Sequence, residues 1–187
     1  MVMVQEAYLP MTLFVPDISD EQFDELCQRY ADFRLEYTGE GELIIMPPTD
    51  RRTSLRNAKI GFQLMGWALS DGNGEVTESS GGFTLPNGAR RSPDAAWSSQ
   101  KTFALGRCPE FVIELLSPSD RPKVTRAKMR EWIENGAELA WMINPTTRTV
   151  TVFRPGQEPE DHVGLDSIVG EGPVVGFVLN LRDIWAI

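Results

Sequence analysis

The hydrophobic and polar positions along the chain predict three helices. Residues 20–32 begin with a Ser-to-Gln capping-box pattern and place their apolar residues on one face. Residues 53–70 form a longer helix, because apolar side chains recur there at spacings of three and four. This stripe consists of Leu55, Ala58, Phe62, Met65 and Leu69. A third helix begins at Pro122 and is closed by Gly136, since proline favours the first helical turn and glycine the position after the last.

Extended runs lie between and after these helices. Residues 33–48 consist of two apolar runs around a Thr-Gly-Glu-Gly turn, which predicts a β-hairpin. After residue 74 the pattern becomes that of short strands, and the Asn-Gly pair at 87–88 is a strong turn signal. The remaining strands are predicted at 111–116, 139–144 and 148–155 and near the C-terminus.

The order of these elements predicts the fold class. The strand 111–116, the helix after Pro122 and the strand 139–144 make a βαβ unit, so the two strands should be parallel. We therefore expect a mixed α/β (α+β) fold with a central sheet flanked by helices. A length of 187 residues suits one domain, which we place over residues 1–187.

Composition narrows the class of protein further. With 41% hydrophobic and 24% charged residues, the chain is typical of a soluble globular protein, and no apolar run approaches the roughly 20 residues that span a bilayer. The first ten residues lack the basic and apolar regions of a secretory signal, so we expect a cytoplasmic protein with reduced Cys27 and Cys108. The single histidine, His162, argues against zinc sites and His-based triads. A metal would therefore be held by carboxylates, which favour Mg²⁺ or Mn²⁺.

The formal charge of −9 is the bulk property that argues most strongly against a nucleic-acid ligand. A negative field repels phosphates, so binding would need a local basic patch or a metal bridge to phosphate.

Two carboxylates are the main candidates for chemistry. Glu114 stands in the middle of the run FVIELL, which is apolar on both faces, as in a central strand covered by helices. A buried carboxylate is costly unless it is paired, so Glu114 should have a cation nearby or face a cleft. Asp94 follows Pro93 and leads into a short apolar strand. If the two strands are neighbours, both acids could hold one Mg²⁺; alternatively, Asp94 is a turn residue and Glu114 pairs with an arginine.

The helix after Pro122 carries one lysine on its apolar side. On a helical wheel, Lys128 falls within the arc formed by Val124, Met129, Trp132 and Ile133, whereas the other basic residues fall outside it. Lys128 could cover apolar surface with its stem and reach solvent. It could instead bring its ammonium to the metal site and stabilise charge at phosphorus or orient water.

These residues resemble the PD-(D/E)xK nuclease superfamily and, more closely, the Uma-type family of restriction-endonuclease-like proteins. The matching stretches cover most of residues 36–157: GELIIMPPT, LPNGARRSPDAAW, FVIELLSPSD, KMREWIENGAELAWMINP and VTVFRPGQ. The resemblance implies a restriction-endonuclease-like core and a Mg²⁺- or Mn²⁺-dependent endonuclease. In it, Asp94 corresponds to the Asp of the PD motif and Glu114 to the acid of (D/E)xK, and both bind the metal. The motif lysine would stand at position 116, which is Leu here, and the resemblance places the catalytic lysine at Lys128 on the following helix.

Weaker candidates complete the predicted site. Glu42 and, less so, Glu36 lie in the first hairpin, where the superfamily often adds an acid, although either could be a solvated hairpin residue. Gln63 on the long helix could hydrogen-bond in the site. The candidates for phosphate binding, which could instead only solubilise loops, are Arg51, Arg52, Arg56, Arg90 and Arg91.

Three functions remain open at this point. The first is hydrolysis of nucleic acid, with DNA as the expected substrate, by a homodimer expected by analogy. The second is a nucleic-acid-binding module on the nuclease fold without catalysis, motivated by Leu116 and the acidic surface. The third is a protein-interaction module, which could be dimeric and whose interface would come from Trp97, Trp132, Trp141 and the apolar C-terminal strand.

Overall fold

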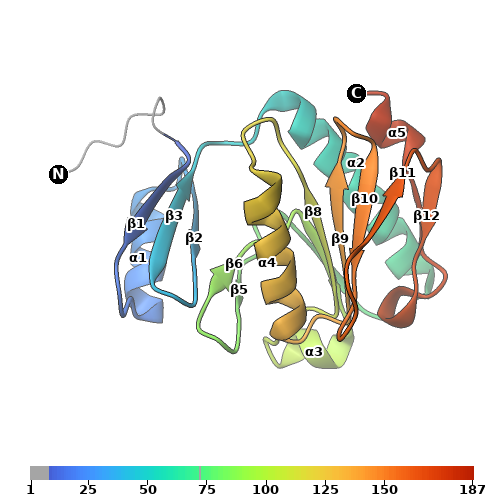
Figure 1. Cartoon of the computed structure of the whole chain (residues 1–187). Coiled ribbons are helices and arrows are strands. Elements are labelled where there is room, and N and C mark those ends of the chain that lie inside the picture. Colours follow the sequence, from blue (N-terminus) through green and yellow to red (C-terminus); the bar gives the residue numbers. More distant parts are fainter. Residues whose placement is uncertain (1–8, 72) are drawn as a thin grey trace.

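The computed structural model describes residues 9–71 and 73–187, and its main parts are a larger sheet with a long helix on each face and a smaller sheet to one side (Figure 1). The mixed α/β class predicted from the sequence is confirmed. Within these two ranges no helix has the length and apolarity required to cross a bilayer. The first eight residues, where we expect no secretory signal, lie outside the described residues.

The larger sheet has six strands and carries the predicted βαβ unit. The order of its strands is β11 (Glu160–Val163), β10 (Thr149–Phe153), β9 (Leu139–Asn144), β8 (Phe111–Leu115), β7 (Ala95–Ser98) and β4 (Glu75–Glu78). The strands β8 and β9 are parallel, with Phe111 opposite Leu139, and the other neighbouring pairs are antiparallel. The crossover helix α4 (Pro122–Glu134) joins the parallel pair, as the sequence predicts.

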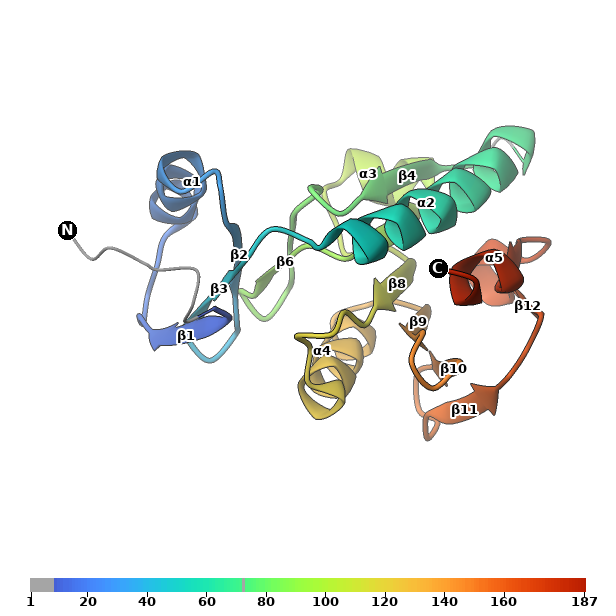
Figure 2. The ribbon, with the colours of Figure 1, turned by 90° about the horizontal axis from the view of Figure 1, so that it is seen from above.

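A helix covers each face of this sheet, and β8 lies between the two (Figure 2). Helix α2 (Arg51–Asp71) packs Ile60 and Leu64 against the side chains of Phe111 and Ile113 on one face. Helix α4 packs Met129 and Trp132 against Val112 and the rest of the other face. This coverage explains why β8 is apolar on both sides. Glu114 shares its face with Val112 and therefore points toward α4.

The smaller sheet stands beside α4 and contains the predicted hairpin (Figure 1). Its strand order is β1 (Met11–Phe14), β3 (Glu42–Met46), β2 (Arg34–Tyr37), β6 (Arg90–Arg91) and β5 (Phe83–Thr84). Helix α1 (Asp20–Arg29) begins with the predicted capping box, in which Ser19 and Gln22 satisfy each other's backbone N–H groups. Phe23 of α1 packs with Leu35 and Tyr37 of β2, which leaves the intervening Glu36 on the opposite face.

Short elements close the rest of the fold. The helix α3 (Gln100–Ala104) occupies a segment whose pattern fits a loop or a short helix. The C-terminal part forms β12 (Ser167–Val169), η2 (Gly172–Val174), β13 (Val178–Asn180) and α5 (Arg182–Trp185). Phe177 and Leu179 pack from this part into the core beneath α2.

The structure corrects the predicted role of the long helix's apolar stripe. Helix α2 exists at the predicted place, but the residues buried against the sheet are Ile60, Leu64 and Ala68. Leu55, Ala58, Phe62, Met65 and Leu69 face solvent instead. The helix is apolar on two sides, and periodicity alone could not show which side meets the sheet.

Two further expectations about apolar residues are wrong. Trp97, Trp132 and Trp141 are at most 6% exposed and belong to the core, so they cannot supply an interface. Val124 belongs to the apolar arc of α4, but its side chain is 59% exposed and lines the cleft between α4 and the smaller sheet instead of entering the core.

Candidate active site

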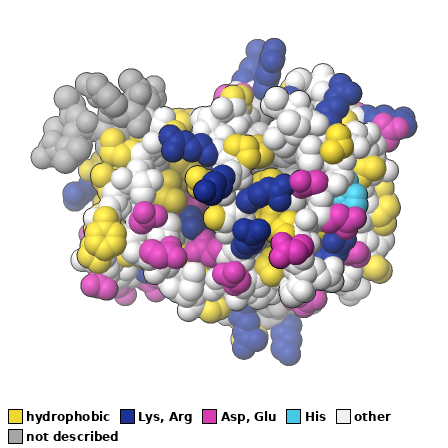
Figure 3. Space-filling model, in the orientation of Figure 1, with side chains coloured by type: hydrophobic (Ala, Val, Ile, Leu, Met, Phe, Trp, Pro, Cys, Tyr) yellow, Lys and Arg dark blue, Asp and Glu magenta, His cyan; other side chains and the backbone are white. Residues whose placement is uncertain are grey.

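A cleft of about 1050 Å³ separates the smaller sheet from α4. Its lining comes from β2, β3, the ends of β7 and β8, the loop 117–121 and one side of α4. Figure 3 shows the face of the molecule that carries α4, and basic and acidic side chains lie next to each other there. Three buried acids reach this cleft: Glu36, Asp94 and Glu114.

Glu114 is held between a cation and a donor from α4. Its Oε1 atom lies 2.6 Å from Lys128 Nζ and accepts a hydrogen bond of 3.2 Å from Trp132 Nε1. Burial raises the pKa of Glu114 to about 7, since the neighbouring Lys128 offsets only part of the loss of solvation and Asp94 adds repulsion. The carboxyl is thus poised to exchange a proton near neutral pH.

Asp94 lies opposite Glu114 in the sheet. The pairing of Ala95 with Ile113 in β7 and β8, continued by one residue, sets Asp94 beside Glu114. The carboxylate of Asp94 accepts hydrogen bonds from Leu115 N and from Asn57 Nδ2, each 2.8 Å long. Burial raises the pKa of Asp94, and the charges and hydrogen bonds around it do not fully compensate.

Lys128 connects two of the acids. Besides Glu114, its Nζ atom donates to Glu36 Oε1 at 2.7 Å and to the carbonyl of Ser92 at 3.3 Å. Burial would lower the pKa of Lys128, but the carboxylates of Glu114 and Glu36 outweigh it and raise the pKa. The lysine therefore stays charged among the acids, and its ammonium does not snorkel to bulk water.

Glu36 lies at the centre of this arrangement, although the sequence ranks it below Glu42. Its second oxygen, Oε2, accepts a hydrogen bond of 3.0 Å from Arg91 Nη1. Burial favours the neutral acid, but Lys128 and Arg91 together outweigh it and lower the pKa of Glu36. The alternation around it carried a usable signal, because Leu35 and Tyr37 enter the core and Glu36 must face the other way.

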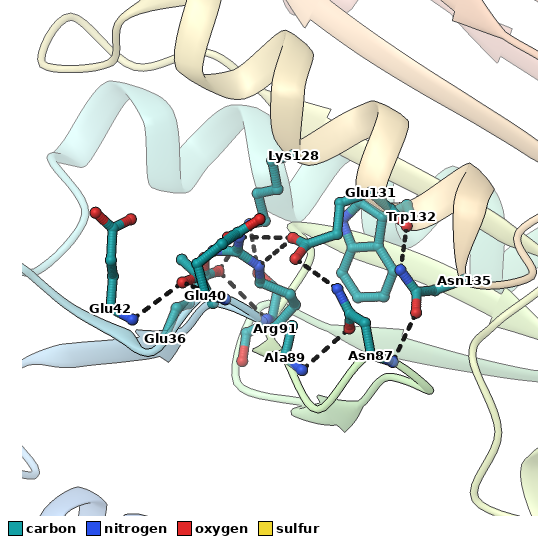
Figure 4. A network of polar contacts seen from close by, with 12 residues as sticks. Glu36, Glu40, Glu42, Asn87, Ala89, Arg91, Lys128, Glu131, Trp132 and Asn135 are labelled. Carbon is teal, nitrogen blue, oxygen red and sulfur yellow. Dashed lines mark hydrogen bonds and ion pairs between the residues drawn. The ribbon is translucent and has the colours of Figure 1, made fainter. Parts of the chain in front are cut away.

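Arg91 is anchored on its other side by α4 (Figure 4). Its guanidinium reaches Glu131 Oε2 at 2.6 Å through Nε and at 2.5 Å through Nη2. Asn87 joins the same network by donating to Glu131 Oε1 at 3.1 Å. Arg91 is 7% exposed and its guanidinium is paired with Glu36 and Glu131. It therefore holds Glu36 in place. The expectation that Arg91 binds phosphate is wrong.

None of the other candidate phosphate ligands lines the cleft. Arg90 pairs with Asp20 at 2.9 Å and stacks against the rings of Phe23 and Tyr37. Arg56 donates to carbonyls at the C-terminal end, those of residues 184 and 187. Arg51 and Arg52 are exposed at the start of α2, outside the lining of the cleft.

Two weak candidates are not brought to the group of acids. Glu42 is exposed at the rim of the cleft, and its side chain lies well to the side of Lys128 (Figure 4). Gln63 is hydrogen-bonded to the backbone of Asn180, at 2.7 Å from Asn180 N, on the side of α2 that faces β13. The residue of α2 that is hydrogen-bonded to one of the acids is Asn57, whose partner is Asp94.

Asn57 and Arg34 were missed in the sequence. Asn57 falls on the buried face of α2, four residues after Thr53 and three before Ile60, and a polar residue in that register is a detectable signal. Its Oδ1 atom is buried and accepts no hydrogen bond from any of the residues that the structure describes. Arg34 Nη2 lies 3.9 Å from Asp94 Oδ1 and extends along the cleft, but its role depends on strand pairing and leaves no trace in the sequence.

The acids fit a hard divalent ion only in part. Asp94 and Glu114 offer adjacent carboxylate oxygens, and Mg²⁺ commonly takes one or two such ligands and keeps water or substrate oxygens on the rest. Within the described residues, no three acidic, histidine or cysteine side chains converge closely enough to hold a metal as they stand. Glu36 is separated from the pair by Lys128, so two protein carboxylates are the donor set to consider.

The sequence and the fold of the chain are each similar to those of known proteins. The chain matches the Uma2 family, described as "putative restriction endonuclease", over residues 20–182, and it therefore belongs to that family. It is similar in fold to a protein from Anabaena variabilis whose crystal structure is described as that of "a putative nuclease belonging to DUF820". The likeness has a TM-score of 0.72 and 20% identity, and it covers 81% of this chain and 89% of the other. No curated protein matches the chain.

Proposed function

We propose that this protein is a Mg²⁺- or Mn²⁺-dependent endonuclease that hydrolyses phosphodiester bonds. The observation that carries the proposal is the placement of Asp94 beside Glu114 at the base of a cleft, with the ammonium of Lys128 at 2.6 Å from Glu114. Asp94 and Glu114 would hold the ion, which when bound supplies Lewis-acid stabilisation of phosphoryl oxygens and a more acidic water. Membership of the Uma2 family supports the same reaction.

Each side chain of the site has a distinct part in this proposal. The β7–β8 register and the Leu115 N–H orient Asp94. Lys128 supplies positive charge close to the reacting phosphate or holds the attacking water. Glu36 keeps Lys128 in position from the opposite side, and Arg91 in turn keeps Glu36 in position.

We propose that the substrate is nucleic acid and that DNA is preferred to RNA as the first substrate to test. Acidic side chains outnumber basic ones in the lining of the cleft. The binding of phosphate groups would therefore depend on the metal and on the exposed cations at the edge of the cleft. Arg34, Arg121 and Arg130 lie in the cleft lining, and Arg51 and Arg52 lie nearby at the start of α2. We further propose one restriction-endonuclease-like domain over residues 1–187, a homodimeric assembly and a cytoplasmic location; the last agrees with Cys27 and Cys108 both being free thiols.

Metal binding is the first experiment. Calorimetric titration of Mg²⁺ and Mn²⁺ into wild type should give binding that Glu114→Ala abolishes and that Glu42→Ala, a rim control, leaves intact. Wild type with Mn²⁺ should then cut DNA or RNA, whereas Asp94→Ala should not. Equal cutting by wild type and Asp94→Ala would disprove the proposal, and so would the absence of metal binding by wild type even with a short duplex present.

A second function is favoured by one specific observation. Position 116, where the superfamily motif has its lysine, is a leucine that packs in the core with Trp132. If Lys128 does not replace the motif lysine, the protein is a nucleic-acid-binding module without catalysis. In that case Lys128→Ala would leave nucleic-acid binding unchanged, and wild type would bind DNA without cutting it at any metal concentration.

A further inference from the structure

Arg34 is a cation of the cleft whose guanidinium keeps unpaired donors. Its side chain is 30% exposed, and its Nη1 atom donates to Thr49 Oγ1 at 3.3 Å. The Nη2 atom lies 3.9 Å from Asp94 Oδ1, which is too far for a hydrogen bond. The Nε atom is buried and finds no acceptor within residues 9–71 and 73–187. A buried donor without an acceptor in the protein is typical of a group that binds a ligand or an ordered water.

Two acids near Arg34 take their hydrogen bonds from other groups. Asp94 accepts from the side chain of Asn57 and from a backbone N–H, each at 2.8 Å. The pKa of Glu78 is lowered above all by the hydroxyl of Ser80 and only to a smaller extent by the charge of Arg34. Arg34 therefore acts on both carboxylates through its charge, and its unpaired N–H groups remain available to an anion that enters the cleft.

The buried cations on the α4 side of the cleft are already engaged with acceptors of the protein. The ammonium of Lys128 has as many acceptors around it as it has N–H groups, namely Glu114 at 2.6 Å, Glu36 at 2.7 Å and the carbonyl of Ser92 at 3.3 Å. Arg91 is paired with an acid on either side. Lys128 can act on a phosphate through its charge, but a hydrogen bond from it to phosphate would have to replace one of these contacts.

Arg34 stands at the Asp94 end of the paired acids. Arg34 and Glu36 are two residues apart on β2, so both side chains point to the face of the smaller sheet that lines the cleft. Glu36 contacts Lys128 beside Glu114, whereas Arg34 lies beside Asp94. Each acid of the pair thus has one cation at its side. A phosphate that approaches the two carboxylates meets the unpaired donors of Arg34 on the side of Asp94.

We infer that Arg34 is the residue that hydrogen-bonds the substrate phosphate beside Asp94 and Glu114. The inference rests on the proposed nuclease function, because it names the protein donor for the phosphate of that substrate. A guanidinium suits this role, since its planar N–H groups can bind two phosphate oxygens at once. A contact with phosphate carries no base information, so Arg34 should serve every base sequence equally.

The test measures the affinity of the full chain for short DNA duplexes by fluorescence anisotropy over a range of salt concentrations. Ca²⁺ replaces Mg²⁺, and a gel of the same samples checks that the DNA stays intact. Arg34→Met should weaken binding about 10–100-fold, alike for duplexes of unrelated sequence. The slope of log affinity against log salt should become less steep by about 0.9, the value for one lost phosphate contact. Arg34→Lys should keep the slope and recover part of the affinity. The matched control is Arg29→Met, at an exposed position of α1 outside the cleft lining, which should bind like wild type.

Calorimetric titration of Mn²⁺ without DNA separates this role from a structural one. At about pH 8, which favours the ionised acids, Arg34→Met should bind Mn²⁺ as tightly as wild type or more tightly, because a positive charge beside Asp94 has been removed. Weaker binding of both Mn²⁺ and DNA would mean that Arg34 only holds Asp94 in place, and this would overturn the inference. An unchanged DNA affinity and salt slope in Arg34→Met would also overturn it, while cleavage by wild type with Mg²⁺ would leave the proposed function standing. A wild type that neither binds nor cuts DNA or RNA would contradict the proposed function and the inference with it.

Discussion

The ammonium of Lys128, on a helix, lies 2.6 Å from the carboxylate of Glu114, on the central strand that this helix covers. Glu114 breaks an otherwise apolar run, and Lys128 breaks the otherwise apolar face of α4. Each is the reason that the other can be buried, because an isolated charge in this layer would be strongly destabilising. The pair opens onto the cleft, so it is also available to a metal or a phosphate.

Removing this cation should destabilise the protein. Lys128→Met leaves Glu114 and Glu36 buried without their shared partner, and breaking a buried ion pair costs about 3–5 kcal/mol. We expect a decrease of that size in the free energy of unfolding, measured by urea denaturation without metal, and a partial recovery with Mn²⁺. Lys123→Met, at an exposed position of the same helix, should change stability by less than about 0.5 kcal/mol. Equal stability of the two variants would mean that Lys128 is not held as the structure shows.

The affinity for metal should increase with pH through the neutral range. Burial raises the pKa of Glu114 to about 7, so below that pH a metal must displace a proton from the carboxyl. The raised pKa of Asp94 acts in the same direction. We expect the affinity for Mn²⁺ to fall about tenfold per pH unit below 7 and to level off above it. Calorimetry at pH 6, 7 and 8 (about one unit apart, to bracket this pKa) in buffers of different ionisation enthalpy measures both affinity and proton release. The same affinity at all three values, with no proton release, would contradict the assignment.

Arg91 and Glu131 should be energetically coupled through their buried contact. Arg91→Met leaves Glu36 and Glu131 without their common partner, so we expect a loss of about 3–5 kcal/mol of stability. Glu131→Gln should cost less in the Arg91→Met background than in wild type, because the contact that it breaks is already absent. A double-mutant cycle by urea denaturation gives the coupling, and Arg130→Met serves as an exposed arginine control. If the stability losses of the two single variants add up to that of the double variant, the contact between Arg91 and Glu131 contributes no coupling energy.

We expect substitution of Asn57, but not of Gln63, to lower the affinity of the site for metal. Asn57→Ala removes the hydrogen bond to Asp94 Oδ1, and loss of a group that orients a ligand typically weakens metal binding about 10–100-fold. Gln63→Ala, on the same helix, removes contacts with Asn180 far from the acids and should leave the affinity unchanged. Calorimetric titration with Mn²⁺ compares the two variants. If Gln63→Ala weakened binding as much as Asn57→Ala, the site would extend to a part of α2 where the structure does not place it.

Local patterns were sufficient for the main helices, for most of the strands and for part of the site. The helices 51–71 and 122–134, the first hairpin and the parallel βαβ unit could be predicted, because periodicity, caps and turns are properties of neighbouring residues. The expectation that Glu114 has a cation nearby agrees with the structure, since it followed from the energy of a buried charge in a run that reads as a central strand.

The rest was decided by how the elements pack. Helix α2 has two apolar sides, and only its contact with the sheet shows that Leu64 is inside and Phe62 outside. Arg91 reads as a loop cation, but the pairing of β6 with β2 brings it to Glu36. Asp94 meets Glu114 through a strand register that no spacing of twenty residues encodes. The sequence by itself determined which residues could form helices and strands and which charges needed partners. The tertiary structure decided which partner each charge received, because that choice depends on contacts between segments far apart in the chain.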